Sequence, residues 1–137
     1  MAPKFVDTNV FLRYFTRDAP DKAERCFQLF QQVKGGVTEL TTSESVIAEL
    51  VSVLSSPRLY NVPRHQVRDL LAPVLSLRGL RIANRRLYLR ALDFYAEHDV
   101  DFEDALSVAH MERRRLSVIV SYDQGFDRFG GVVREEP

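Results

Sequence analysis

The sequence predicts an α/β fold, a three-layer α/β/α sandwich whose mostly parallel central sheet has four to five strands. Short apolar segments alternate along the chain with longer stretches of helical periodicity. Strands that are separated by helices pair in parallel and carry helices on both faces of the sheet. A chain of 137 residues is long enough for one domain with a buried core and too short for two. We therefore expect residues 1–137 to form a single domain.

The first half of the chain is expected to hold two strands and four helices. Asp18-Ala19-Pro20 starts the second of these helices, because proline suits the first helical turn, and Gly35-Gly36 ends it. Ser43 is expected to cap the third helix. The strands are expected over residues 4–6 and 37–42, and the helices over residues 8–15, 18–35, 43–54 and 63–77.

The second half is expected to continue the alternation. Asn84 and Asp101 are typical residues for the start of a helix, and the segment before Ser121 is rich in the β-branched residues that favour strands. The strands are expected over residues 79–82, 116–120 and 132–133, the helices over residues 84–95 and 101–115, and a single helical turn over residues 126–129.

Charge is unevenly distributed although the net charge is zero. Residues 1–57 carry a net charge of −1, residues 58–90 of +7 and residues 91–137 of −6. Sixteen of the 19 basic residues are arginine, which binds phosphate as a bidentate fork. An arginine-rich segment beside acidic residues suits a metal-dependent enzyme that acts on a phosphate polymer. A solvated helix face or a bias toward arginine explains the same pattern without such a function.

The cysteine content and the lengths of the apolar runs indicate the cellular location of the protein. Cys26 is the single cysteine, which excludes an internal disulfide and fits a reducing environment; packing explains it better than catalysis. The first residues show no apolar signal region, and no apolar run approaches the roughly 20 residues of a membrane helix. The expected location is the cytoplasm.

Two aspartates follow predicted strands. Asp7 ends the first strand, and Asp123 comes just after the strand expected over residues 116–120. In open α/β sheets, ligands bind outside the carboxyl ends of the strands. Each residue also has a structural explanation, since Asp7 suits a helix cap and Asp123 suits a turn. Asp127 lies close to Asp123 in the sequence and is an alternative candidate for the acid of this segment.

Four further acids lie on two of the predicted helices. Glu49 flanks the apolar stripe of its helix, and Glu44 flanks the other side, so periodicity does not choose between them. Asp101 and Asp104 stand at the start of a helix, where they also suit capping and the helix dipole.

The acids of these four segments together point to a metal site. Clustered carboxylates repel one another unless a cation sits among them. Oxygen ligands favour Mg²⁺ or Mn²⁺ over zinc, and the three histidines show no zinc-like spacing.

These motifs resemble the PIN-domain nucleases, and among them the VapC-type toxins of type II toxin–antitoxin systems. The resemblance covers nearly the whole chain, and the matching segments are Asp7-Thr8-Asn9-Val10, Leu12-Arg13-Tyr14-Phe15 with Arg17-Asp18, Val46-Ile47-Ala48-Glu49-Leu50-Val51, Phe102-Glu103-Asp104-Ala105-Leu106 and Ser121-Tyr122-Asp123. The resemblance favours Glu49 over Glu44 as the site acid of its helix.

The resemblance implies a PIN-like fold and a Mg²⁺- or Mn²⁺-dependent endoribonuclease that leaves a 5′ phosphate. The implied catalytic and metal-binding residues are Asp7, Glu49, Asp104 and Asp123, with Asp7 and Asp104 as the first choice for direct ligands. Thr8, Asn9, Asp101 and Ser121 would support them. Arg85 and Arg86 are expected to bind RNA. A homodimer and a cognate antitoxin of VapB type are the implied partners, with no membrane association.

Two alternatives remain open from the sequence. One is a PIN-like ribonuclease with a role in RNA processing rather than a toxin. The other is a non-catalytic binding module in which the carboxylates serve only as caps.

Overall fold

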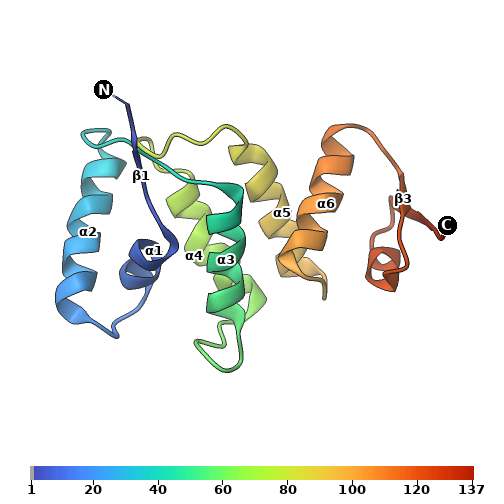
Figure 1. The fold of residues 1–137 in the computed structure, drawn as a ribbon, viewed down its shortest axis with the longest axis horizontal. Coiled ribbons are helices and arrows are strands. Elements are labelled where there is room, and N and C mark those ends of the chain that lie inside the picture. Colours follow the sequence, from blue (N-terminus) through green and yellow to red (C-terminus); the bar gives the residue numbers. More distant parts are fainter. Residues whose placement is uncertain (1) are drawn as a thin grey trace. The chain divides into compact units, whose positions relative to one another are not determined.

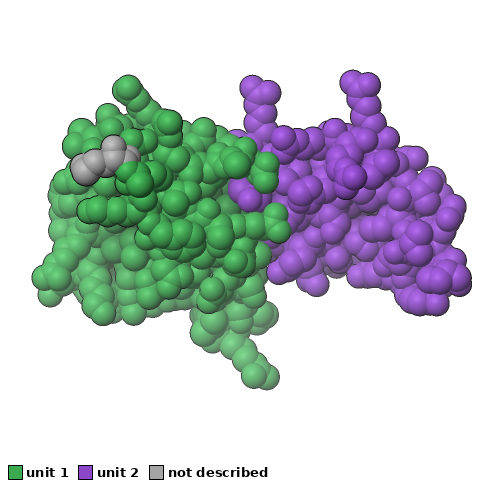
Figure 2. Space-filling view, turned by 45° about the horizontal axis from the view of Figure 1, so that its top comes forward, with its two compact units in different colours: residues 1–85 green, residues 86–137 purple. Residues whose placement is uncertain are grey.

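The computed structural model describes residues 2–137, and the chain divides into two compact units, residues 1–85 and residues 86–137 (Figure 2). Both units combine α-helices with short parallel strands. The single domain expected from the chain length stays a prediction. No helix within residues 2–137 combines the length and the apolar content that crossing a membrane requires.

The first unit is mostly helical (Figure 1), and it contains one parallel strand pair. Lys4 of β1 lies opposite Leu40 of β2, and Leu80 forms a further parallel bridge with Leu40. Its elements are β1 (Lys4–Phe5), α1 (Thr8–Phe15), α2 (Pro20–Lys34), β2 (Leu40–Thr41), α3 (Glu44–Ser55) and α4 (Arg64–Leu75).

Helix α1 packs against both α2 and α3 in the core of the first unit. Its Phe11 is 1% exposed, and the Phe11 ring lies 5.4 Å from the ring of Phe30 on α2. The apolar stripe of α3 is buried as its periodicity predicts, and it comprises Val46, Ile47, Leu50, Val51 and Leu54. This packing fixes the start of α1 relative to α3, which matters because both elements carry predicted site residues.

The second unit contains two helices and a second parallel strand pair. Val118 lies opposite Val133 in this pair. The elements are α5 (Arg85–Glu97), which begins at the last residue of the first unit, α6 (Phe102–Arg113), β3 (Val118–Val120), the 3₁₀ helix η1 (Gln124–Arg128) and β4 (Val133–Glu135). The apolar side chains of α5 and α6 are largely buried.

The six helices follow the sequence prediction to within two residues at either end, and the Ser43 cap is confirmed by a hydrogen bond that Ser43 Oγ accepts from the backbone N–H of Val46. Three strands are shorter than predicted, whereas β4 covers residues 133–135 where residues 132–133 were expected. Residues 79–82 supply only the bridge at Leu80, and the segment over residues 37–42 is a strand only at Leu40–Thr41. Strand composition indicates where a strand can form, whereas ladder partners decide how far it extends.

The predicted central sheet of four to five strands is not shown. Residues 2–137 form two ladders of two strands each, one in each unit. The α/β class and the parallel pairing agree with the sequence prediction, and the three-layer arrangement stays a prediction.

Candidate metal centre

Asp7 joins β1 to α1 at the position expected for the first acid. Its backbone is extended (φ −94°, ψ 167°), and its Oδ1 accepts a hydrogen bond of 2.8 Å from the backbone N–H of Thr8. Asp7 therefore caps α1, while its side chain remains exposed to solvent. Capping and metal binding are compatible, because a carboxylate has lone pairs beyond the one used by the cap.

Thr8 connects the start of α1 to Glu49. The Thr8 residue is 5% exposed, and its Oγ1 donates a hydrogen bond of 3.0 Å to Oε2 of Glu49 on α3. A fixed hydroxyl partner restricts the rotamers of a glutamate that otherwise points into solvent. Asp7, Thr8 and Glu49 thus form one connected group in the first unit, and we call it the first acidic group.

Asp104 and Asp123 form the second acidic group. Asp104 lies in the first turn of α6 and is half-buried, whereas Asp123 follows β3 and is exposed. The pKa of Asp104 is raised from its ordinary value, first because burial penalises the charged form and next because of the charge and hydrogen bond of Asp123. The charges of Asp101 and Glu103 raise it further.

The loop after β3 holds Asp123 through local hydrogen bonds. The backbone N–H of Asp123 donates to Oγ of Ser121 over 3.0 Å, and Oδ1 of Asp123 accepts from the backbone N–H of Gly125 over 2.8 Å. Asp127, the competing acid, forms an ion pair of 3.1 Å with Arg134. Asp123 is therefore the acid of this loop that faces Asp104, and Ser121 supports it as a positioning residue would.

Asp101 occupies the N-cap position of α6 with an extended backbone, but its carboxylate makes no capping hydrogen bond. Asp101 is therefore the N-cap residue as predicted, but its side chain does not supply the capping hydrogen bond. The Asp101 carboxylate instead lies exposed and adds to the negative potential around Asp104.

The second acidic group fits a divalent cation in charge and ligand type. Two adjacent carboxylates, one of which holds its proton more tightly than usual, are stabilised by a positive ion between or beside them. All the acids concerned offer oxygen, the ligand type of Mg²⁺ and Mn²⁺. Within residues 2–137, however, no three His, Cys, Asp or Glu side chains are grouped so as to hold a metal ion.

The two arginines predicted to bind RNA differ in their surroundings. Arg85 donates from Nε to the carbonyl oxygen of Leu75 over 2.8 Å, and from Nη2 to the carbonyl oxygen of Leu80. Leu75 is the last residue of α4, where backbone carbonyls lack partners within the helix. Arg85 therefore stabilises the end of α4, a role that the sequence did not reveal. Arg86 is exposed. RNA binding by either residue stays a prediction.

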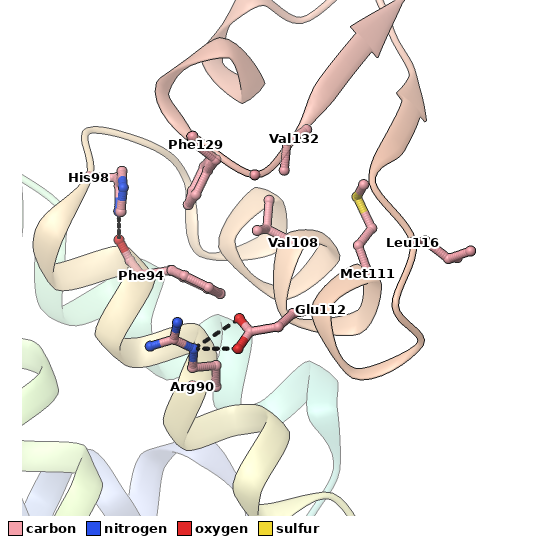
Figure 3. Close-up of a pocket in the computed structure, with 11 residues that line it drawn as sticks. Arg90, Phe94, His98, Val108, Met111, Glu112, Leu116, Phe129 and Val132 are labelled. Carbon is pink, nitrogen blue, oxygen red and sulfur yellow. Dashed lines mark hydrogen bonds and ion pairs between the residues drawn. The ribbon is translucent and has the colours of Figure 1, made fainter.

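A cavity of about 320 Å³ in the second unit has a different chemistry (Figure 3). Aromatic and aliphatic side chains line it, with the Phe94 and Phe129 rings edge to face at 5.4 Å. Its cation, Arg90, is paired with the carboxylate of Glu112 at 3.0 Å. Among the described residues that line this cavity, none is one of the predicted site acids. The cavity is therefore mainly apolar and does not belong to either acidic group.

The model of the PIN domain family matches residues 4–132, which leaves only residues 1–3 and 133–137 outside the match. The matched range includes both acidic groups. No curated protein matches the sequence.

Proposed function

The chain belongs to the PIN domain family, and we propose that it is a Mg²⁺- or Mn²⁺-dependent endoribonuclease. PIN domains are generally metal-dependent nucleases, so the family supports a hydrolase of phosphodiester bonds. The observation that carries the proposal is the pairing of Asp104 with Asp123, in which the pKa of Asp104 is raised by burial and by its acidic neighbours. Two neighbouring carboxylates are costly for a structural purpose alone and useful for holding a cation.

We propose that Asp7, Glu49, Asp104 and Asp123 supply the carboxylate oxygens for the metal. Asp7 and Asp104 are the proposed direct ligands, and Glu49 and Asp123 complete the ligand set or hold ligating waters. A divalent ion supplies positive charge that acidifies a water molecule and neutralises the attacked phosphate. The carboxylates would also orient that water, so that it attacks phosphorus in line and expels the 3′ oxygen.

Several neighbouring side chains are proposed to position these acids. The Thr8 hydroxyl already donates to Glu49, and the Ser121 hydroxyl accepts from the backbone N–H of Asp123. Asn9 is exposed two residues after Asp7, where its amide can contact substrate. Asp101 adds negative potential near Asp104, and its side chain supplies no capping hydrogen bond. Hydrogen bonds to ligating groups fix their orientation and strengthen metal binding.

The proposed cellular role is that of a type II toxin, acting in the cytoplasm as a homodimer and inhibited by a VapB-type antitoxin. This part of the proposal is supported by the resemblance of residues 7–18 to the toxin branch of the family. It predicts a small neighbouring gene for the antitoxin, and growth arrest on expression of the chain that expression of the neighbour relieves. Growth without arrest, together with retained nuclease activity, would instead favour a ribonuclease of RNA processing.

Cleavage of structured RNA in the presence of Mg²⁺ or Mn²⁺ tests the enzymatic proposal. We expect Asp7→Asn, Glu49→Gln, Asp104→Asn and Asp123→Asn each to lower the cleavage rate by at least about 100-fold, the scale of losing a catalytic metal ligand or its partner. Glu44→Gln is the matched control, because Glu44 lies on the same helix as Glu49 and is also exposed. Equal cleavage by Glu49→Gln and Glu44→Gln would contradict the assignment.

A further inference from the structure

A second cavity lies between α1 and α2 in the first unit and has a volume of about 300 Å³. It is lined by Asn9, Val10, Arg13, Lys22, Arg25 and Cys26. Among the described residues that line it, three are cationic and none is acidic. We call it the basic cavity.

The cations of the basic cavity lack ion-pair partners in the part of the chain that the structure describes. No ion pair joins Arg13, Lys22 or Arg25 to a carboxylate among residues 2–137. Glu24 lies next to Arg25 in sequence, but its carboxylate accepts a hydrogen bond of 2.9 Å from Nε2 of Gln28 and lines a different cavity. The cavity in the second unit shows the contrast, because there Arg90 is already paired with Glu112.

We propose that the basic cavity binds the phosphodiester backbone of a single-stranded segment of RNA. The inference rests on the proposed function, because it takes RNA as the substrate. Two guanidinium groups and an ammonium group match the charge of backbone phosphates, and the Asn9 amide adds a hydrogen-bond donor and acceptor. Asn9 also places the cavity on α1 two residues after Asp7, a proposed metal ligand. Bound backbone would thus run close to the start of α1.

The net charge of the first unit agrees with RNA binding at the basic cavity. Residues 1–85 carry 12 basic and 8 acidic side chains, a net charge of +4, whereas residues 86–137 carry 7 basic and 11 acidic side chains, a net charge of −4. A positive surface raises the local concentration of nucleic acid, and an open pocket of unpaired cations gives the backbone a place to bind.

RNA binding in EDTA tests the proposal independently of catalysis. A fluorescent single-stranded oligoribonucleotide is titrated with the full chain over a series of salt concentrations. Each lost phosphate contact makes the slope of log K against log salt less negative by about 0.7, so the double variant Lys22→Gln/Arg25→Gln should make it less negative by about 1.4 and weaken binding at low salt about tenfold. Lys34→Gln is the control for the single variant Lys22→Gln, since Lys34 is an exposed lysine of α2 outside the cavity and each variant removes one charge. Equal losses of binding in Lys34→Gln and Lys22→Gln would overturn the proposal.

Cys26 provides a direct reporter of occupancy. It is the only cysteine of the chain, it is half-buried, and it lines the basic cavity. Burial raises the pKa of its thiol, and the positive charge of Arg13 acts in the opposite direction. We expect saturating RNA to slow the reaction of Cys26 with a thiol reagent at least about fivefold in EDTA, because bound backbone covers the thiol and neutralises Arg13. The double variant should lose this protection.

The two experiments separate this proposal from the proposed function. If RNA protects Cys26 but the chain cleaves no RNA with Mg²⁺ or Mn²⁺, the basic cavity is supported and the catalytic assignment fails. If the chain cleaves RNA while Cys26 reacts at an unchanged rate, the basic cavity fails alone. Protection by an acidic polypeptide such as polyglutamate, with none by RNA, would overturn the proposal in favour of a protein ligand.

Discussion

Thr8 is the residue whose side chain most directly links two parts of the candidate site. It is buried, and its hydroxyl donates to Glu49. We predict that Thr8→Val lowers the free energy of unfolding by about 1 kcal/mol, the usual net value of one hydrogen bond. Cleavage should fall about tenfold or more, because Glu49 loses the partner that orients it. Urea unfolding and RNA cleavage assays measure the two effects.

Thr42→Val is the matched control for this prediction. The Thr42 hydroxyl donates over 2.8 Å to the carbonyl oxygen of Val6, so its loss also removes one partly buried hydrogen bond. We expect similar destabilisation but little change in cleavage, and Thr8→Ser should keep most of the activity. Equal activity of Thr8→Val and Thr42→Val would show that the contact with Glu49 is only structural.

Asp104 is predicted to make the metal-free protein less stable as pH rises. Its pKa is raised in the folded state by burial and by Asp123, so the folded protein binds its proton more tightly than the unfolded chain does. The free energy of unfolding should therefore fall as pH rises from the ordinary aspartate value through the raised folded-state pKa. Thermal unfolding in EDTA across this pH range should show the decline.

Asp104→Asn removes the charge that causes this decline. The variant should unfold at a higher temperature than the unmodified chain at neutral pH in EDTA, and its stability should depend less on pH between the ordinary and raised pKa values. A lower unfolding temperature for Asp104→Asn at neutral pH would mean that hydrogen bonds of the carboxylate outweigh its repulsion by Asp123.

At the scale of elements, Gly79 allows the chain to pass between α2 and β2. Its backbone N–H donates to the carbonyl oxygen of Val33 over 2.9 Å, and its own carbonyl accepts from Leu40 over 2.8 Å. A Cβ atom at this position would lie 2.4 Å from the carbonyl oxygen of Thr38 and 2.6 Å from that of Val33. Because both neighbours are backbone atoms, the strain can be relieved only by moving the backbone of α2 at Val33 or of the segment before β2 at Thr38.

We therefore predict that Gly79→Ala destabilises the protein by about 3 kcal/mol, at the upper end of overpacking costs. Gly130→Ala should change stability by less than about 0.5 kcal/mol, since a Cβ atom there meets no atom within 4 Å among the described residues. Urea unfolding of the two variants makes the comparison. Equal stability of both would mean that residues 79–81 shift easily and do not hold β2 in place.

Helices were predicted better than strands because their signals are local. The cap at Ser43 and the apolar stripe of α3 lie within the helix itself and needed no knowledge of its neighbours. Leu80, by contrast, forms its single bridge with Leu40, a partner 40 positions earlier in the chain. The length of a ladder depends on such distant partners, and a single sequence does not specify them.

Only part of the candidate site could likewise be predicted from the sequence. The acids at Asp7 and Asp123 were visible because each follows a strand, and Glu49 was selected over Glu44 only by a family resemblance. The hydrogen bond between Thr8 and Glu49 and the role of Arg85 at the end of α4 depend on tertiary packing, which no local pattern reveals.

The basic cavity was also missed, although part of its signal was present. Lys22 and Arg25 stand three residues apart on α2, a spacing that places them on one helix face. Arg13 joins them only through the packing of α1 against α2. The sequence analysis instead predicted RNA binding within residues 58–90, where arginines are most numerous. The number of charged residues in a segment does not show which of them lack an ion-pair partner in the folded chain.

At the scale of the whole molecule, the proposed function requires both acidic groups, one from each unit. Metal that binds only the folded state raises its stability by about 2.7 kcal/mol at a concentration 100 times the dissociation constant. We predict that saturating Mn²⁺ raises the unfolding temperature of the chain by about 8 °C, given the usual relation between free energy and unfolding temperature at this size. Thermal unfolding with Mn²⁺ and with EDTA measures the shift.

The variants Asp7→Asn and Asp104→Asn then decide whether the first and the second acidic group both take part. Each should lose most of the Mn²⁺-dependent shift, while Glu44→Gln, which alters an exposed acid outside both groups, should retain it. If Asp104→Asn abolishes the shift and Asp7→Asn leaves it intact, the second acidic group binds the ion without Asp7, and Asp7 is then a helix cap alone. Because the hydrogen bond from the Thr8 backbone to Asp7 survives replacement by asparagine, a loss of the shift in Asp7→Asn cannot be attributed to a lost cap.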